Sequence, residues 1–183
     1  MLAYVFWHWK QTDIVAAEYE ERQRHFHKAL ATDCSPGFIR SFSTEISRAP
    51  WVAAGNDAYE DWYLVQDFAA LGILNQAAVS ASRTAPHDAA AKFAAGGTAG
   101  LYGLRGGVAL DQPKYSYWFG KPPGTSYGDF FGQIAPIVEQ VQGALWMRQM
   151  VLGPAREFCL HATAPVSHLA LFEPLVIPMR SIF

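Results

Sequence analysis

The chain alternates short apolar runs with amphipathic stretches, which is the pattern of strands separated by helices. In the first half, runs rich in β-branched and aromatic residues predict four strands, at Ala3–Trp9, Phe38–Thr44, Asp61–Gln66 and Leu101–Arg105. After the first strand, a helix is predicted by a stripe at helical spacing, formed by Val15, Tyr19, Arg22, Phe26 and Leu30.

The remaining connections of the first half are predicted from capping and turn residues. Asp67 is expected to cap a helix that runs to about Ser80, and Pro86 to begin a short Ala-rich helix that ends at Gly96-Gly97. Residues 50–59, which include Gly55-Asn56-Asp57, are predicted to form a turn or loop. The resulting order, β-α-β-β-α-β, is the ferredoxin-like motif.

The second half begins the same pattern again. Tyr115–Lys121 aligns with Tyr4–Lys10, with Tyr, Trp and Lys at equal offsets. A helix and three strands are then predicted, at Tyr127–Gln142, Gly143–Trp146, Glu157–His161 and Leu175–Ile182. We therefore expect an α+β protein of two fused ferredoxin-like units, 1–110 and a degenerate copy 111–183, packed as one domain.

Composition narrows the class of protein. The 183 residues are 51% hydrophobic and 14% aromatic, and their 16% of charged residues is below the roughly 25% of a typical domain. So apolar a chain will collapse, which excludes disorder. The formal net charge of −2 has both signs scattered, so no basic surface predicts a nucleic acid or an acidic membrane as partner.

Neither targeting segments nor cysteines predict an exported protein. Residues 1–9 are apolar but lack a basic start and contain His8, so a strand is the better interpretation. The sequence has no run of roughly 18 apolar residues to span a membrane. Cys34 and Cys159 lack the spacing of a disulfide framework or a zinc site. We expect two reduced thiols in a cytoplasmic protein.

The fold motifs resemble those of a known superfamily. The motifs are the aromatic first strand 4–9, the Glu-rich helix after it, Pro36-Gly37-Phe38, and Trp62-Tyr63-Leu64-Val65 followed by a helix that starts at Asp67. In these features the chain resembles the dimeric α/β-barrel superfamily, of the antibiotic-biosynthesis-monooxygenase and stress-responsive barrel type. The resemblance implies that two sheets close an α/β barrel, here within one tandem chain. It leaves the chemistry open, because the superfamily holds cofactor-free oxygenases, isomerases and haem proteins.

Strand periodicity suggests where a binding site lies. Alternate residues share a face, which groups Tyr4, Phe6 and His8, then Phe38, Arg40 and Phe42, then Trp62, Leu64 and Gln66. If the two sheets face each other, Tyr117 joins them. The expectation is an apolar pocket between the sheets with a few convergent polar groups, and the alternative is a plain aromatic core.

Two residues are candidates for chemistry in this pocket. His8 suits proton transfer because its ordinary pKa is near 6.5, and Arg40 suits an anionic group of a substrate. Phe6, Phe38, Trp62, Tyr117 and His87 are the candidate ligand-binding residues. The alternatives are a buried His8 bonded structurally, an Arg40 paired with an acid such as Asp61, and a capping or loop role for His87. His25 and His27 are interpreted as surface residues.

Other catalytic signatures are absent from the sequence. The glycines at 96–100 and 103–107 do not follow the phosphate-loop pattern and are interpreted as close backbone approaches or bulges. There is no GxSxG, no HExxH and no metal-spaced carboxylate cluster. Hydrolases that depend on a nucleophile or a metal are therefore disfavoured.

The function predicted from sequence is binding of a small apolar or aromatic molecule between two sheets, as a cofactor-independent oxygenase or isomerase. One alternative is a haem protein of the same superfamily with a His axial ligand. The other is a non-enzymatic module that self-associates, for example as a homodimer, since a surface poor in charge tends to be covered.

Overall fold

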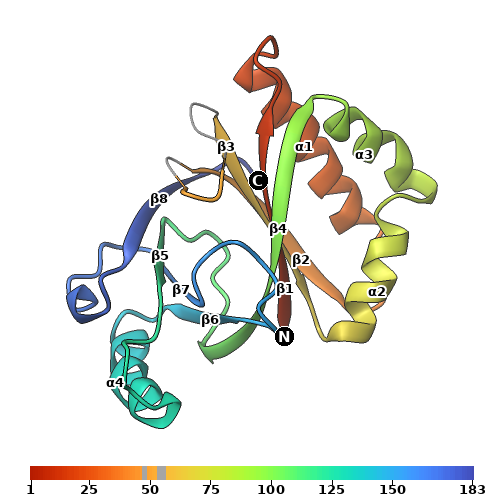
Figure 1. Cartoon of the computed structure of the whole chain (residues 1–183). Helices are drawn as coiled ribbons and strands as arrows, with labels where there is room; N and C mark the ends of the chain where they lie inside the picture. Colours follow the sequence, from red (N-terminus) through yellow and green to blue (C-terminus); the bar gives the residue numbers. More distant parts are fainter. Residues whose placement is uncertain (47–48, 53–56) are drawn as a thin grey trace.

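A computed structural model describes residues 1–46, 49–52 and 57–183 of the chain (Figure 1). Its eight strands are β1 (Leu2–Lys10), β2 (Phe38–Ile46), β3 (Ala58–Val65), β4 (Ala94–Gly107), β5 (Tyr115–Phe119), β6 (Ala144–Arg148), β7 (Phe158–Ala162) and β8 (Leu175–Ser181). Its helices are α1 (Ala16–Thr32), α2 (Phe68–Ala77), α3 (Thr84–Ala91) and α4 (Tyr127–Gln140), with short 3₁₀ turns at Ala81–Arg83 and Ala170–Phe172.

The strands form one closed antiparallel barrel, in the order β1-β3-β2-β8-β5-β7-β6-β4. Around the ring, the first four strands of the chain are neighbours in the order β4-β1-β3-β2, and the last four in the order β8-β5-β7-β6. The two sets meet where β2 pairs with β8 and where β4 pairs with β6. Closure leaves no free sheet edge.

Helices cover the outer face of the barrel. In Figure 1, α1, α2 and α3 lie on the side formed by the first four strands, and α4 lies on the opposite side. Two helix starts are fixed by caps, since Asp67 accepts a hydrogen bond from the Ala70 amide at 2.9 Å and Ser126 accepts one from the Asp129 amide at 3.1 Å. The cap at Asp67 is therefore confirmed.

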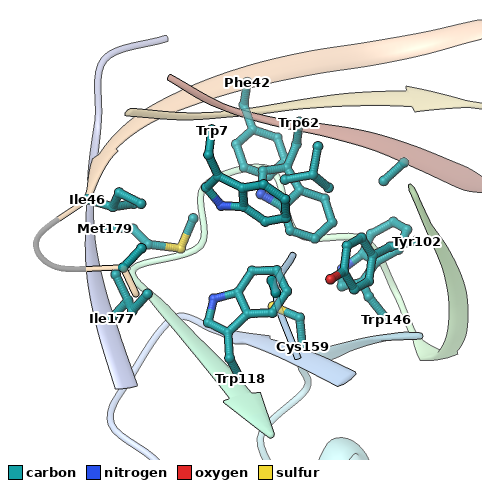
Figure 2. Close-up of a cluster of buried hydrophobic side chains, with 14 of the residues drawn as sticks. Trp7, Phe42, Ile46, Trp62, Tyr102, Trp118, Trp146, Cys159, Ile177 and Met179 are labelled. Carbon is teal, nitrogen blue, oxygen red and sulfur yellow. The ribbon is translucent and has the colours of Figure 1, made fainter. Parts of the chain in front are cut away.

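The barrel interior is filled by aromatic side chains. Trp7, Trp62, Trp118 and Trp146 are at most 1% exposed and point toward one another from four strands (Figure 2). Phe42, Tyr102 and Cys159 belong to the same cluster. Separate apolar clusters lie outside the barrel, under α1 and α2 and under α4.

Some element boundaries predicted from the sequence are wrong. β3 begins at Ala58 rather than Asp61, so the predicted loop at 50–59 is too long, and its residues 53–56 lie outside the described part. The helix expected to end at Gly96-Gly97 stops at Ala91, and those glycines lie inside β4. A close approach explains them, because a Cβ on Gly97 would lie 2.4 Å from the Phe6 ring. Among the described residues, no helix is long and apolar enough to cross a membrane.

Candidate functional site

A cavity of about 660 Å³ lies outside the barrel, between the outer face of the sheet and the first three helices. Its floor comes from β1 and β3, and its walls come from α1, α2 and α3. The side chains that line it include Tyr4, Phe6, Tyr19, Phe26, Asp61 and Leu71. This is the mostly apolar setting with few polar groups that small-molecule sites share.

Asp61 is the polar centre of the cavity floor. Its Oδ2 atom lies 3.2 Å from Nε2 of His8 and 3.3 Å from Nε2 of His27, and it accepts a hydrogen bond of 2.8 Å from the Tyr63 hydroxyl. The two imidazole contacts are ion-pair distances without the alignment of a linear hydrogen bond. All three acid and imidazole side chains are at most 1% exposed.

Each imidazole is held at its other nitrogen by a hydroxyl. Nδ1 of His8 lies 2.6 Å from the Tyr19 hydroxyl, and Nδ1 of His27 lies 2.7 Å from Ser41 Oγ. The groups that flank Asp61 thus form a continuous buried chain, from a tyrosine of α1 to a serine of β2. The two hydroxyl contacts fix the orientation of each ring, and the contact with Tyr19 offers a path for a proton to His8.

The surroundings of Asp61 favour its ionised form. Burial alone would raise the pKa of Asp61, but His8 and then His27 outweigh it and hold that pKa well below its usual range. Burial and the neighbouring carboxylate both raise the pKa of Tyr63 and of Tyr19. The site therefore presents a carboxylate among neutral phenols.

The second oxygen of this carboxylate, Asp61 Oδ1, is buried and has no hydrogen-bond partner among the described residues. A buried acceptor that remains unpaired costs about 1–3 kcal/mol. Asp61 also lines the cavity. The unpaired acceptor therefore belongs to a residue of the cavity lining.

Aromatic rings hold the two histidines in place. His8 stacks between Phe6 and Tyr59 at centroid distances of 5.1 and 5.6 Å, and His27 stacks on Tyr63 at 5.3 Å. His8 itself is not part of the cavity wall, whereas Tyr19 is. Phe6, Tyr19 and Asp61 of the cavity lining all contact the imidazole of His8, and Tyr19 does so by a hydrogen bond.

The structure separates the residues that the sequence analysis placed in one pocket. Phe6 and His87 line the cavity, and His8 lies beneath it. Trp62 points into the barrel, and Phe38 packs in the outer cluster under α1 and α2 without lining the cavity. The expectation of one shared face was wrong, because β1 turns its face with His8 outward while β3 turns its face with Trp62 inward.

Arg40 lies away from His8, at one end of the barrel. Its guanidinium donates hydrogen bonds to the carbonyls of Ala109 and Leu110 at 3.0 and 2.7 Å, and it pairs with Asp111 at 3.1 Å. Its guanidinium also lies over the ring of Phe42, which belongs to the barrel interior. The expectation that Arg40 and His8 converge on one ligand was therefore wrong. The alternative, that Arg40 pairs with an acid, is confirmed, with Asp111 in place of Asp61 as the partner.

Tyr117 belongs to the opposite side of the molecule. It lies in the cluster under α4, and its hydroxyl accepts a hydrogen bond from the Val166 amide at 2.7 Å. The space between the sheets, where a cavity was expected, is occupied by the tryptophan cluster. The cavity lies on the helix side instead.

Sequence reasoning missed three residues of the site, Asp61, His27 and Tyr19. His27 was interpreted as a surface residue, but it is fully buried. The spacing between His25 and His27 indicates that one of the two is buried. Two residues about 200° apart on a helix cannot both face solvent when one side of the helix packs on a sheet. Tyr19, Gln23 and His27 follow at intervals of four on the buried face of α1, which is a usable signal.

His8 and His27 do not fit the role of a haem ligand. Axial ligation needs a free imidazole nitrogen, but His8 and His27 have both nitrogens directed at protein groups. The buried His161 packs against Trp62 with a centroid distance of 4.4 Å, inside the filled barrel. Over the described ranges, no group of three or more His, Cys, Asp or Glu side chains has a metal-site arrangement.

Comparisons with known proteins bear on the fold. No family model matches the chain, and no curated protein matches it in sequence. Among solved structures it is similar to a candidate monooxygenase from Fusobacterium nucleatum, with a TM-score of 0.69, 10% identity, and coverage of 100% of this chain and 92% of that chain. A candidate monooxygenase from Lactobacillus acidophilus matches with a TM-score of 0.60 and 6% identity, covering 100% of this chain and 94% of that chain.

An anthrone oxidase-like protein is a third structural neighbour. It matches with a TM-score of 0.52 and 8% identity, covering 100% of this chain and 91% of that chain. The chain has the fold of the dimeric α+β barrels. At these identities the likeness extends to fold alone, so the chemistry has to be argued from the residues of the site.

Proposed function

We propose that the protein binds a small, largely aromatic molecule with an acidic hydroxyl, a phenol or an enol, in the cavity between β1, β3 and the first three helices. His8, paired with Asp61, accepts the hydroxyl proton. The reaction is a cofactor-independent oxygenation or isomerisation of the resulting anion.

The unpartnered Oδ1 of Asp61 carries this proposal. It is a buried acceptor on a residue of the cavity lining, and apart from Gln23, Asn75 and His87 the rest of that lining is aromatic and aliphatic. A planar ring system with one hydroxyl edge matches both properties, because the ring fills the apolar volume and the hydroxyl donates to Oδ1. An anionic ligand that has no hydrogen to donate would be repelled by the same carboxylate.

The Tyr19 hydroxyl provides the route to His8. For the reaction, the substrate hydroxyl turns its one proton from Asp61 Oδ1 to the Tyr19 oxygen, and the tyrosine proton passes to Nδ1 of His8, which lies 2.6 Å from that oxygen. The imidazolium that forms lies 3.2 Å from the Asp61 carboxylate, which stabilises it. His27 holds Asp61 from the other side and acts as a positioning residue.

Deprotonation is the step that this site accelerates. A phenolate or enolate is far richer in electrons than its parent, so it either reacts with dioxygen or takes a proton back at carbon, which isomerises it. The names of the structural neighbours, two candidate monooxygenases and an anthrone oxidase-like protein, favour the first outcome. An anthrone is a polycyclic ketone with an enol form, which agrees with the chemistry argued from Asp61.

We further propose that residues 1–110 and 111–183 are fused ferredoxin-like units of which the first alone keeps this chemistry. The identical strand order in the two sets supports the relation. Trp7 lies opposite Glu60 on β1 and β3, and Trp118 lies opposite Cys159 on β5 and β7. In that register, His8 corresponds to Phe119 and Asp61 to Leu160.

The helices continue this correspondence. Tyr19, Gln23 and His27 of α1 are buried at intervals of four, and so are Phe130, Ile134 and Val138 of α4. Five polar positions of the site, His8, Tyr19, Gln23, His27 and Asp61, thus have apolar counterparts in the second half. Because the second half builds the same architecture without these polar groups, the fold does not require them, and a functional reason for keeping them remains.

The test compares 2-naphthol with naphthalene, two probes that differ by one hydroxyl. We expect 2-naphthol to bind more tightly by calorimetric titration. The preference should fall about tenfold or more in Asp61→Asn, because a charged hydrogen bond contributes about 1.5–3 kcal/mol. Asp13→Asn changes an exposed aspartate on the surface and serves as the control. Equal affinity of the two probes for the native protein would overturn the proposal.

A second measurement separates the reactions. Oxygen uptake and product analysis with anthrone distinguish oxygenation from tautomerisation, with Tyr19→Phe as the variant that interrupts the path to His8. If haem addition instead produces a Soret band, the haem alternative replaces this proposal.

A further inference from the structure

A second carboxylate, Glu60, is buried inside the barrel on the opposite face of β3 from Asp61. It is 0% exposed, and its two oxygens accept hydrogen bonds from two indoles. Nε1 of Trp7 lies 2.5 Å from Oε2, and Nε1 of Trp62 lies 2.7 Å from Oε1. Among the described residues, no Lys, Arg or His side chain forms an ion pair with it.

This arrangement is expensive for a structural core. An unpaired buried carboxylate costs several kcal/mol, and an apolar residue of similar size would avoid that cost. Its partners are also unusual, because an indole N–H is a donor only and cannot accept a proton from a protonated Glu60. Burial raises the pKa of Glu60 to about 7, against the effect of the two indole hydrogen bonds. Near neutral pH the group is therefore poised to exchange a proton.

The two indoles belong to a connected set of tryptophan rings. Trp7 lies 5.6 Å from Trp118 and 5.4 Å from Trp51, and Trp62 lies 5.2 Å from Trp146 and 6.3 Å from Trp118, all between ring centroids. Figure 2 shows Trp7, Trp62, Trp118 and Trp146 gathered in the barrel interior. Trp51 is only partly buried, so the set reaches from the centre of the barrel toward the surface.

We propose that Trp7, Trp62 and Glu60 form a proton-coupled redox site, in which either tryptophan is oxidised by one electron and Glu60 takes up its indole proton. The co-reactant is a one-electron oxidant of high potential. It gains one electron, the indole N–H bond breaks, and an O–H bond forms on the oxygen of Glu60 that already accepted the hydrogen bond. The products are a neutral tryptophanyl radical and a neutral carboxylic acid, and a one-electron reductant reverses the step.

The chemistry of the pair explains why a carboxylate stands there. An oxidised indole is positively charged and a much stronger acid than indole itself, so a carboxylate at hydrogen-bond distance first stabilises the charge and then removes the proton. The other titratable groups that face Glu60 are Tyr102 of β4, Cys159 of β7 and, across β3, Asp61. Burial raises the pKa of both Tyr102 and Cys159, so neither competes for the proton as a base.

The proposal is independent of the chemistry in the cavity, because its oxidant can come from solution. Because neighbouring rings lie 5–6 Å apart, electron transfer between them can move the radical through the set toward Trp51. In an oxygenase such a set would draw oxidising equivalents away from the substrate cavity.

The experiment generates a ruthenium(III) tris-bipyridyl oxidant by a laser flash beside the intact protein. Transient absorption and electron paramagnetic resonance distinguish a neutral tryptophanyl radical from a radical cation. The native protein is expected to form the neutral radical. In Glu60→Gln the ratio of neutral radical to cation should fall about tenfold or more, the change that one pKa unit corresponds to. Trp9→Phe, outside the ring set, is the control.

Two further measurements keep the test decisive if Glu60→Gln is unstable. Trp7→Phe/Trp62→Phe should lose most of the long-lived radical while Trp9→Phe keeps it. In the native protein the neutral fraction should rise as the pH increases through about 7, where Glu60 loses its own proton. Equal radical yields in the double variant and in Trp9→Phe, or a neutral fraction that ignores both Glu60 and pH, would overturn the proposal.

Discussion

Asp61 lies opposite Phe6 on β1 and β3, and Leu160 lies opposite Tyr117 on β5 and β7, so the two halves of the barrel place an acid and a leucine at the same position of their sheets. The acid draws two histidines and a tyrosine to itself, whereas the leucine is part of an ordinary apolar cluster. The difference between these two environments can be tested by converting one into the other.

Replacing the whole polar set with its apolar counterparts should give a stable protein without a binding site. The combined variant carries the second-half residues His8→Phe, Tyr19→Phe, Gln23→Ile, His27→Val and Asp61→Leu, together with Tyr63→Phe, which removes the hydroxyl that donates to Asp61. Well-packed apolar residues in place of a buried ionic cluster are neutral or stabilising by about 1–4 kcal/mol. Urea denaturation should show unchanged or higher stability, and the preference for 2-naphthol over naphthalene should disappear.

The single variant Asp61→Leu is the matched comparison. It leaves His8, His27 and the Tyr63 hydroxyl buried without their acceptor, which should cost about 3–5 kcal/mol in the free energy of unfolding. If the combined variant is as unstable as the single one, the polar set is structural, and the functional argument from the second half fails.

Arg40 is expected to matter for stability and not for binding in the cavity. It ties β2 to the segment that joins the two halves, through the carbonyls of Ala109 and Leu110. Arg40→Ala should lower the free energy of unfolding by about 2 kcal/mol, since hydrogen bonds to charged groups contribute about 1.5–3 kcal/mol. The affinity for 2-naphthol should equal that of the native protein and that of the control Arg105→Ala, which changes an exposed arginine. A selective loss of affinity in Arg40→Ala would restore the role that the sequence suggested for it.

The order of elements could be predicted from the sequence, but the site could not. Apolar runs located every strand, and Asp67 located the start of α2. The faces of β1 were grouped correctly, since His8 and Phe6 do share one. Which face looks into the barrel could not be decided, because helices cover the outside and both faces are therefore apolar and aromatic.

Asp61 illustrates the remaining difficulty. In the sequence it is the polar residue before an apolar run, a position that usually begins a strand at the surface. Its meaning depends on His8 and His27, which are 53 and 34 residues away along the chain and reach it only through the pairing of β1 with β3 and the packing of α1. Single-sequence periodicity describes each element separately and contains no information about such pairs.

Glu60 should make the protein less stable as the pH rises through the weakly acidic range. Its pKa is raised from 4.5 to about 7 in the folded state, so between these values the folded protein binds more protons than the unfolded chain. Stability therefore falls with increasing pH, by about 3 kcal/mol over the interval. Urea midpoints measured from pH 4 to pH 8 should lose this contribution in Glu60→Gln. An unchanged pH dependence would show that Glu60 titrates normally in the fold.

His161 should act in the opposite direction over nearly the same range. Burial, with a smaller contribution from Arg40, lowers the pKa of His161 from 6.5 to about 3. In this pH range the unfolded chain thus binds a proton that the folded state excludes. The contribution of His161 to the free energy of unfolding is fully present above about pH 6.5 and is lost as the pH falls toward 3, by about 5 kcal/mol at most.

Replacing this histidine should therefore protect the protein in acid. Its Nε2 atom is buried without a partner among the described residues, so His161→Leu removes an unsatisfied polar atom and should be neutral or stabilising at pH 7. At pH 4 to 5 the variant should exceed the native protein in urea midpoint, whereas His168→Leu, at an exposed histidine, should not.

Glu60 and His161 oppose each other between about pH 4.5 and 6.5, so the stability of the native protein should depend only weakly on pH in this range. Each single variant should make this pH dependence steeper, with opposite signs in the two variants. Slopes of the same sign in Glu60→Gln and His161→Leu would contradict both assignments.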